Sequence, residues 1–289
     1  MGPLVTGIGE LLWDMLPSGK QLGGAPCNFA FHARQAGCDS LVISAVGKDK
    51  LGDELLQKLH QLDLSDRYIQ KISFPTSTVS IRLNENGHPD YTIHEQVAWD
   101  FIQWNSQIKE LAGKLDAVCF GSLAQRNRIS QETIVSLILA TRPDCLRIFD
   151  INLRQHYYSR EIVVQSIMLA DVLKLNDDEL PAVAEFTGLS GDVRNQLTDL
   201  LIKLKLKYIV YTMGSKGSII VNDREYSFVE APSVKVADTV GAGDAFTAVF
   251  TAGILRGLPL SQVHRKATEI AALVCTKKGA TPELPDIIF

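Results

Sequence analysis

The chain has 289 residues, a formal net charge of -4 at pH 7 and 46% hydrophobic residues. This composition is typical of a globular protein with a sizeable core. Lysine and arginine form no cluster longer than the pair Lys277-Lys278, so we expect neither nucleic acid nor an anionic membrane surface as a partner. No uninterrupted apolar run approaches the roughly 18 residues that a membrane-spanning helix needs.

Five cysteines are scattered along the chain and form no Cys-x-x-Cys pair. Their odd number and wide spacing favour neither a disulfide framework nor a zinc site. They are typical of small core residues in a reducing compartment. The start of the sequence also lacks the basic and apolar segments of a secretory signal. We therefore expect a cytoplasmic protein.

Short apolar runs rich in β-branched residues alternate along the chain with segments of helical period. The first four such segments are 4–9, 26–37, 40–46 and 49–62. Later strands are expected at 116–121, 146–151, 171–175 and 207–212, with helices near 131–141, 160–169, 177–187 and 192–205. This alternation predicts βαβ units, and hence an α/β fold with a mostly parallel sheet and helices on both of its faces.

The segment 77–95 breaks this rhythm, because apolar and polar residues alternate on both sides of Asn86-Gly87. This pattern predicts a hairpin in a sheet with one exposed face. We interpret it as part of a small β-lid formed by about residues 10–24 and 73–100. A surface hairpin without a gating role is an equally good interpretation of the pattern alone.

No linker rich in glycine, proline or serine divides the chain, so we expect residues 1–289 to form a single domain. Near its end, two consecutive helices are expected at 241–257 and 260–279. The first is apolar around most of its circumference, which predicts that it is buried.

Gly241 and Gly243 precede Asp244 between an apparent short strand and this apolar helix. Backbone N–H groups are unpaired at a helix N-terminus, and the peptide dipoles add positive charge there, so a glycine-rich turn at this place can hold an anion. A carboxylate beside a bound phosphate could act as a general base that takes the proton of an attacking alcohol. Alternatively, Asp244 only caps the helix or complements its dipole.

The stretch DTVGAGDAF (238–246) resembles the C-terminal signature of the ribokinase-like, or PfkB, carbohydrate kinases, and GGAPCNFAFHARQAG (23–37) resembles their N-terminal signature. The resemblance extends over nearly the whole chain through AVGKDKLGDEL (45–55), KLNDDEL (174–180) and YTMGSKGS (211–218). It implies a doubly wound α/β core with a β-lid. The stretches that look most like the fructokinase branch are 9–17, 97–100, 121–126 and 149–154.

The resemblance implies an ATP-dependent sugar kinase that acts on fructose. Asp244 would take the proton of the sugar hydroxyl, while the N–H groups of Gly241, Ala242 and Gly243 would stabilise the transferred phosphoryl group. The alternatives are a 2-keto-3-deoxygluconate or nucleoside kinase with the same fold, or a sugar or nucleotide sensor without catalysis. The expected partners are a sugar and ATP, and the family also suggests a homodimer.

The family's motifs also indicate binding residues. Matches to sugar-binding positions are Asp14, Gly24, Asn28 and Arg154. Matches to nucleotide-binding positions are Asn152, Asn176, Thr212, Gly214 and Gly217. Taken singly, each of these residues is equally typical of a turn, a cap or a solvated charge. Arg82 and Trp99 are expected only to belong to the lid.

Asn176 and Glu179 match the family's N-x-x-E element, which helps to hold Mg²⁺, partly through water. Their spacing is also that of a capping box, which is the structural alternative. Asp238 matches the position of a monovalent cation site, which would bind K⁺. Val240 stands where the family often has threonine, so activation by potassium depends on whether that position acts through its carbonyl or its hydroxyl.

Overall fold

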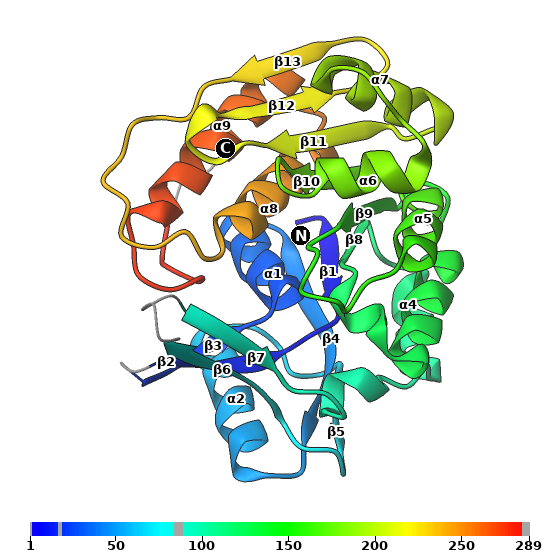
Figure 1. Ribbon diagram of the computed structural model, residues 1–289. Coiled ribbons are helices and arrows are strands. Elements are labelled where there is room, and N and C mark those ends of the chain that lie inside the picture. Colours follow the sequence, from blue (N-terminus) through cyan, green and yellow to red (C-terminus); the bar gives the residue numbers. More distant parts are fainter. Residues whose placement is uncertain (1, 17–18, 84–88, 285–289) are drawn as a thin grey trace.

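The structure is a computed structural model that describes residues 2–16, 19–83 and 89–284. For residues 81–83 and 89–91 it describes the backbone and not the side chains. A nine-stranded sheet forms its centre (Figure 1), in the order β13-β12-β11-β10-β9-β8-β1-β4-β5. Its strands are β1 (Leu4–Ile8), β4 (Asp39–Gly47), β5 (Ile69–Ile72), β8 (Ala117–Phe120), β9 (Leu146–Asp150), β10 (Val172–Asn176), β11 (Tyr208–Thr212), β12 (Ser218–Val221) and β13 (Tyr226–Val229).

The strands from β11 to β5 are all parallel, and only β12 and β13 run antiparallel to their neighbours. From β1 the chain builds outward to β4 and β5, and then returns to build β8 to β11 on the other side of β1. The predicted doubly wound, mostly parallel sheet is therefore confirmed. In such a sheet, ligands bind at the carboxyl ends of the strands, where the winding direction changes.

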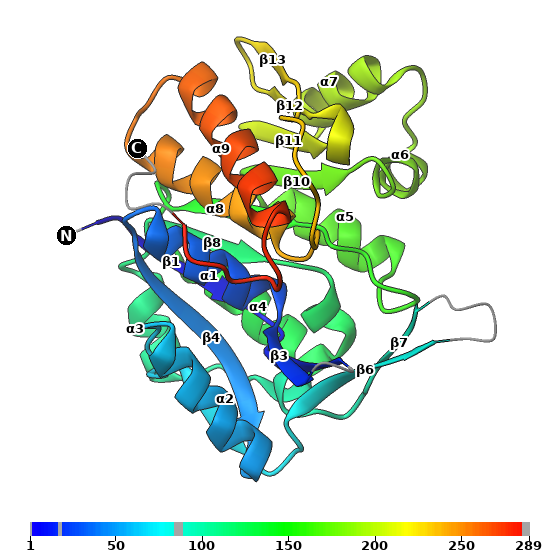
Figure 2. The same ribbon diagram turned by 90° about the vertical axis from the view of Figure 1, so that its left-hand side faces the viewer.

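Helices cover both faces of the sheet (Figure 2). Three helices and the strand side chains beneath them form one apolar cluster: α1 (Ala25–Gln35), α8 (Ala242–Leu255) and α9 (Leu260–Cys275). α2 (Lys50–Gln61) packs beside α1. The opposite face is covered by α3 (Ser106–Ala112), α4 (Arg128–Ala140), α5 (Arg160–Leu169), α6 (Leu180–Thr187) and α7 (Val193–Lys203). As predicted, α8 is buried along most of its length.

A second sheet of four strands lies beside α1, in the order β3-β2-β6-β7 (Figure 1). Its strands are β2 (Leu12–Leu16), β3 (Gly19–Gly23), β6 (Ser77–Leu83) and β7 (Pro89–Ile93). β6 and β7 form the hairpin that the alternating pattern predicts, although Asn86 and Gly87 of its turn lie outside the described residues. The same two segments that we assigned to a lid thus form one sheet. Its gating role stays a prediction.

Two local predictions are wrong. The segment before Gly241 is not a strand: the N–H groups of Ala237 and Asp238 both donate to Cys275 O, at 2.8 and 3.2 Å, and so bind the end of α9 instead of a strand. α9 correspondingly ends at Cys275, before Gly279. As a result, the segment before α8 lies against the end of α9 and the segment that follows it.

All five cysteines are free thiols, and four of them are buried. No helix in the described part of the chain is long and apolar enough to cross a membrane.

Candidate active site

The turn before α8 has the backbone geometry that its glycines permit. Gly241 has φ 80°, in the left-handed region, and a Cβ at this position would clash with Ala280 O. The first i to i−4 hydrogen bond of α8 is the one from Ala245 N–H to Gly241 O, at 2.9 Å. Ala242 N–H donates outside the helix, to Thr239 O at 3.3 Å. Of the three predicted N–H donors, that of Ala242 is therefore already used. Gly243 and Asp244 lie in the first turn, where N–H groups have no partner within the helix.

Asp244 is half-buried and accepts a hydrogen bond from Asn28 Nδ2 at 2.8 Å. Burial, followed by the charge of Asp150, raises the pKa of Asp244 to about 6, while the bond from Asn28 opposes this shift. A carboxyl group with this pKa is ionised near neutral pH yet is a stronger base than ordinary aspartate. Gly241 is the N-cap of α8, and no side chain caps this helix. Asp244 therefore does not cap the helix, but it lies in the first turn, where its charge also complements the helix dipole.

A buried polar group lies behind this turn. Lys174 Nζ lies 3.0 Å from Asp150 Oδ1, and Thr247 Oγ1 donates to Asp150 Oδ2 at 3.0 Å and to Gly243 O at 3.0 Å. Together the three side chains join β9, β10 and α8. We did not predict them, although a charged residue inside each of the apolar stretches IFDI and VLKL was a visible signal.

Glu10, just after β1, is a further residue that we did not predict. Its Oε1 accepts from Ala25 N at 3.2 Å at the start of α1, whereas its buried Oε2 has no hydrogen-bond partner. Burial raises the pKa of Glu10 from its ordinary 4.5 to about 7, and the charge of Asp244 adds to this shift. The first turn of α1 is thus tied to the site twice. Its first residue, Ala25, donates to Glu10, and Asn28 at the end of the turn donates to Asp244.

Asn176 and Glu179 make the reciprocal hydrogen bonds of a capping box, but in the turn before α6, whose N-cap is Glu179 itself. Asn176 Oδ1 accepts from the N–H groups of Asp178 and Glu179, both at 2.9 Å, and Glu179 Oε2 accepts from Asn176 N at 2.9 Å. Glu179 Oε1 accepts from Leu153 N at 3.0 Å. Among the described residues, no group of three or more His, Cys, Asp or Glu side chains could hold a metal ion. The side-chain oxygens of Asn176 and Glu179 already accept backbone hydrogen bonds, so they would bind Mg²⁺ only through water or through a remaining lone pair.

The predicted sugar-binding residues lie on different elements. Asp14 lies on β2, and burial raises its pKa to about 6. Gly23, on the neighbouring strand β3, leaves room for the Asp14 carboxylate, because a Cβ on Gly23 would clash with Asp14 Oδ2. Gly24 has φ 115° and packs against Glu10 O. Arg154 is exposed, and its charge lowers the pKa values of Glu10 and Asp244, so it lies near both carboxyl groups.

The predicted nucleotide-binding residues follow three neighbouring strands. Asn176 and Thr212 are paired in register as the last residues of β10 and β11. Asn152, after β9, has φ 47°, and its carbonyl accepts from Ser122 Oγ at 3.3 Å. The remaining two residues lie at a short 3₁₀ helix, η3 (Gly214–Lys216): Gly214 is its first residue, with φ 55°, and Gly217 directly follows it, with φ 103°.

Asp238 joins two loops. Its Oδ1 accepts from Val240 N at 3.1 Å and its Oδ2 accepts from Gly279 N at 3.0 Å. The side chain of Val240 is exposed. Asp238 therefore holds the segment after α9 against the turn before α8, and its role at a cation site stays a prediction.

Trp99 lies in a short 3₁₀ helix, η1 (Ala98–Phe101), and is fully buried. The Arg126 guanidinium lies 4.1 Å from its ring centroid and binds Asp100 through two hydrogen bonds, at 2.7 and 2.9 Å. Trp99 thus belongs to the core beneath the end of the small sheet. The side chain of Arg82 lies outside those that the structure describes.

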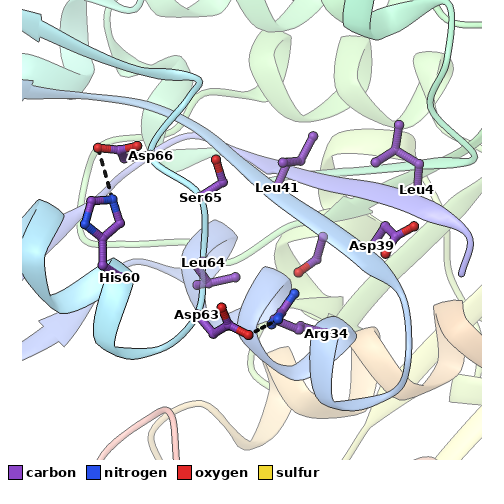
Figure 3. Close-up of a pocket in the computed structure, with 10 residues that line it drawn as sticks. Leu4, Arg34, Asp39, Leu41, His60, Asp63, Leu64, Ser65 and Asp66 are labelled. Atoms are coloured by element: carbon purple, nitrogen blue, oxygen red, sulfur yellow. Dashed lines mark hydrogen bonds and ion pairs between the residues drawn. The ribbon is translucent and has the colours of Figure 1, made fainter. Parts of the chain in front are cut away.

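A separate cavity of about 550 Å³ lies at the amino ends of β1 and β4 (Figure 3). Exposed charged residues line it, including the ion pair of Arg34 with Asp63 and that of His60 with Asp66 at 3.2 Å. None of the predicted site residues is among its lining residues. This cavity lies at the end of the strands opposite to Asp244.

Comparisons with known proteins identify the family and support the fold. The sequence profile of the family described as pfkB family carbohydrate kinase matches residues 18–287. An ATP-dependent 6-phosphofructokinase of Thermoanaerobacterium thermosaccharolyticum is 28% identical over 98% of this chain and 91% of its own length. A fructokinase of Salmonella typhimurium is 28% identical over 99% of this chain and 97% of its own.

Among solved structures, an uncharacterised sugar kinase of Pyrococcus horikoshii in complex with ATP has a TM-score of 0.81. It is 30% identical, and the match covers 96% of this chain and 94% of that one.

Proposed function

The chain belongs to the pfkB family of carbohydrate kinases, and we propose that it transfers the γ-phosphate of ATP to a hydroxyl group of fructose. The observation that carries the proposal is the Asp244 carboxylate, which lies at the N-terminus of a buried helix directly after Gly241 and Gly243. A base is placed there next to backbone N–H groups that can stabilise a phosphate.

In the proposed reaction, Asp244 accepts the proton of the sugar hydroxyl while that oxygen forms a bond to the γ-phosphorus. The bond between this phosphorus and the β–γ bridging oxygen breaks, and ADP leaves. N–H groups in the first turn of α8 stabilise the negative charge on the transferred phosphoryl group. Asn28, whose amide donates to Asp244 at 2.8 Å, orients the base.

Mg²⁺ would neutralise charge on the β- and γ-phosphates, and Asn176 and Glu179 would reach it through water. Glu179 also binds the backbone of Leu153, next to Arg154. We expect this contact to hold the loop with Arg154 beside the proposed phosphate site. For K⁺, Asp238 is the proposed contact, at the junction of the loops before α8 and after α9.

The charges near the acceptor favour a neutral sugar. Glu10, Asp14 and Asp244 are three carboxyl groups whose pKa values are all raised by burial, and Arg154 is an exposed cation near two of them. A phosphate or carboxylate on an acceptor bound beside Asp244 would be repelled by those of these carboxyl groups that are ionised and near it. This argues against fructose 6-phosphate and against 2-keto-3-deoxygluconate, which is an acid.

A coupled assay of ADP release tests the proposal with fructose, fructose 6-phosphate, 2-keto-3-deoxygluconate and a nucleoside as acceptors. We expect the highest kcat/KM with fructose. Turnover with only one of the other acceptors would replace fructose by that compound. Binding of fructose and ATP without turnover of any acceptor would indicate a sensor. The cytoplasmic location and the homodimer stay predictions.

A further inference from the structure

The side chains of Lys174 and Asp150 form a buried ion pair, with exposed fractions of 10% and 6% and 3.0 Å between Nζ and Oδ1. Lys174 lies in the middle of β10, between the fully buried Leu173 and Leu175. Removing two charges from water in the centre of a sheet is costly, and apolar residues often replace such a pair without loss of stability. The position of this pair therefore calls for a reason other than packing.

The position of Gly243 supplies that reason. Lys174 Nζ lies 3.0 Å from the place that a Cβ on Gly243 would occupy, so the absence of a side chain lets the ammonium group approach the first turn of α8. Thr247 fixes the arrangement, because its hydroxyl contacts both Asp150 Oδ2 and Gly243 O at 3.0 Å. A cation is thus held against Gly243, in the first turn of α8.

We propose that Lys174 is a positioning residue of phosphoryl transfer, whose ammonium group, held by Asp150 and Thr247 against Gly243, stabilises the negative charge that collects at the N-terminus of α8. This inference rests on the proposed kinase activity. Lys174 acts through the backbone of the turn and through Asp244, without touching the sugar.

The electrostatics of Asp244 follow the same geometry. The polar and titratable groups that interact with it are Asp150 of β9, Lys174 of β10, Asn28 and the Cys27 thiol of α1, the Cys119 thiol of β8, and Arg154 and Glu10 in the loops after β9 and β1. The charge of Asp150 raises the pKa of Asp244, whereas that of Lys174 lowers it. Losing Lys174 and losing Asp150 should therefore shift the pKa of the base in opposite directions.

Three variants separate this role from a purely structural one: Lys174→Met, Asp150→Asn and the double variant Asp150→Asn/Lys174→Met. Either single variant leaves one buried charge without its partner and should lower Tm, whereas the double variant removes both charges and should regain stability. We expect Lys174→Met and the double variant to lose about 10²-fold in kcat, with the KM for sugar changed less than about threefold. A folded double variant with kcat within about threefold of wild type would overturn the proposal.

The pH dependence of kcat/KM gives a second readout. The acid limb reports ionisation of the base, so Lys174→Met should move it to higher pH and Asp150→Asn to lower pH. Shifts in the same direction, or none, would show that the pair only supports the fold. Wild-type turnover is measured first: if no acceptor is phosphorylated, the proposed function fails, whereas an active wild type with an equally active double variant rejects the role of Lys174 alone.

Discussion

The two ends of the central sheet differ in how they hold charge. At the amino ends of β1 and β4, charged side chains line a cavity of about 550 Å³ but remain largely in water: Asp63 is 82% exposed in its ion pair with Arg34 (Figure 3). Toward the carboxyl ends, Asp150, the last residue of β9, and Lys174, in the middle of β10, form a buried ion pair. Exposed pairs barely perturb one another, whereas buried groups shift their pKa values strongly. Buried charge, more than the size of a hollow, therefore indicates where this protein does its chemistry.

The largest effect is expected for Asp244→Asn at the carboxyl end. An amide cannot accept the proton of the sugar hydroxyl, so kcat should fall by roughly 10²–10⁴-fold while KM for fructose changes little. Steady-state kinetics with the coupled assay measures both constants. The matched variant at the other end of the sheet, Asp63→Asn, should leave both unchanged. If Asp63→Asn lost activity and Asp244→Asn did not, catalysis would belong to the amino end of the sheet and our assignment would be wrong.

A smaller loss is expected for Gly241→Ala. Gly241 has φ 80° and no room for a Cβ beside Ala280, so alanine must displace the turn that carries the N–H donors. We expect a loss of about 10–10²-fold in kcat and of about 1–3 kcal/mol in the free energy of unfolding. Gly188→Ala is the control, because Gly188 has φ 67° but nothing within 4 Å of its Cβ position. It should lose stability without losing activity, and equal kinetic losses in both variants would count against the role of the turn.

The stability of the protein should depend on pH through Glu10. Its pKa rises from 4.5 to about 7 on folding, so the folded state favours the protonated form. That stabilisation is present below about pH 4.5 and is lost as the pH rises through about 7. Glu10→Gln should therefore be more stable than wild type at pH 8 by on the order of 1–3 kcal/mol, with little difference at pH 5. Urea unfolding at both pH values measures this, and a constant difference would contradict it.

The smallest effect is expected at the amino end. Asp63→Asn removes the exposed ion pair with Arg34 but keeps a residue type that tolerates φ 57°. The free energy of unfolding should change by less than about 0.5 kcal/mol. Thermal unfolding in low and high salt checks this. A loss above about 2 kcal/mol would mean that exposed charge at this end matters as much as buried charge at the other.

Local pattern was sufficient for most of the architecture. β-branched runs and helical periods indicated six strands of the central sheet, because burial on both faces of a parallel sheet leaves a strong apolar signal: β1, β4, β8, β9, β10 and β11. The short strand β5 and the short helix α3 were not predicted. The hairpin of β6 and β7 followed from alternation alone. The expected strand before Gly241 was wrong because the choice between a strand and a loop there depends on Cys275, a residue distant in sequence.

The candidate site was only partly readable in the sequence. The glycines and Asp244 stand together in one motif, so their joint role could be predicted. Lys174, Asp150 and Thr247 lie on three separate elements, and only folding brings them to Gly243. The same holds for Asn28, which we expected to bind sugar and which donates to Asp244 in the structure.

The α/β alternation, the glycine-rich turn and the acid beside it could be inferred from local sequence, since these features depend on neighbours within a few residues. Tertiary structure alone decided which charges are buried together, and hence which pKa values are raised and in which direction. The physical reason is that desolvation and Coulomb interaction depend on distances in space, and residues such as Asn28 and Asp244, 216 positions apart, become partners only when α1 packs against α8.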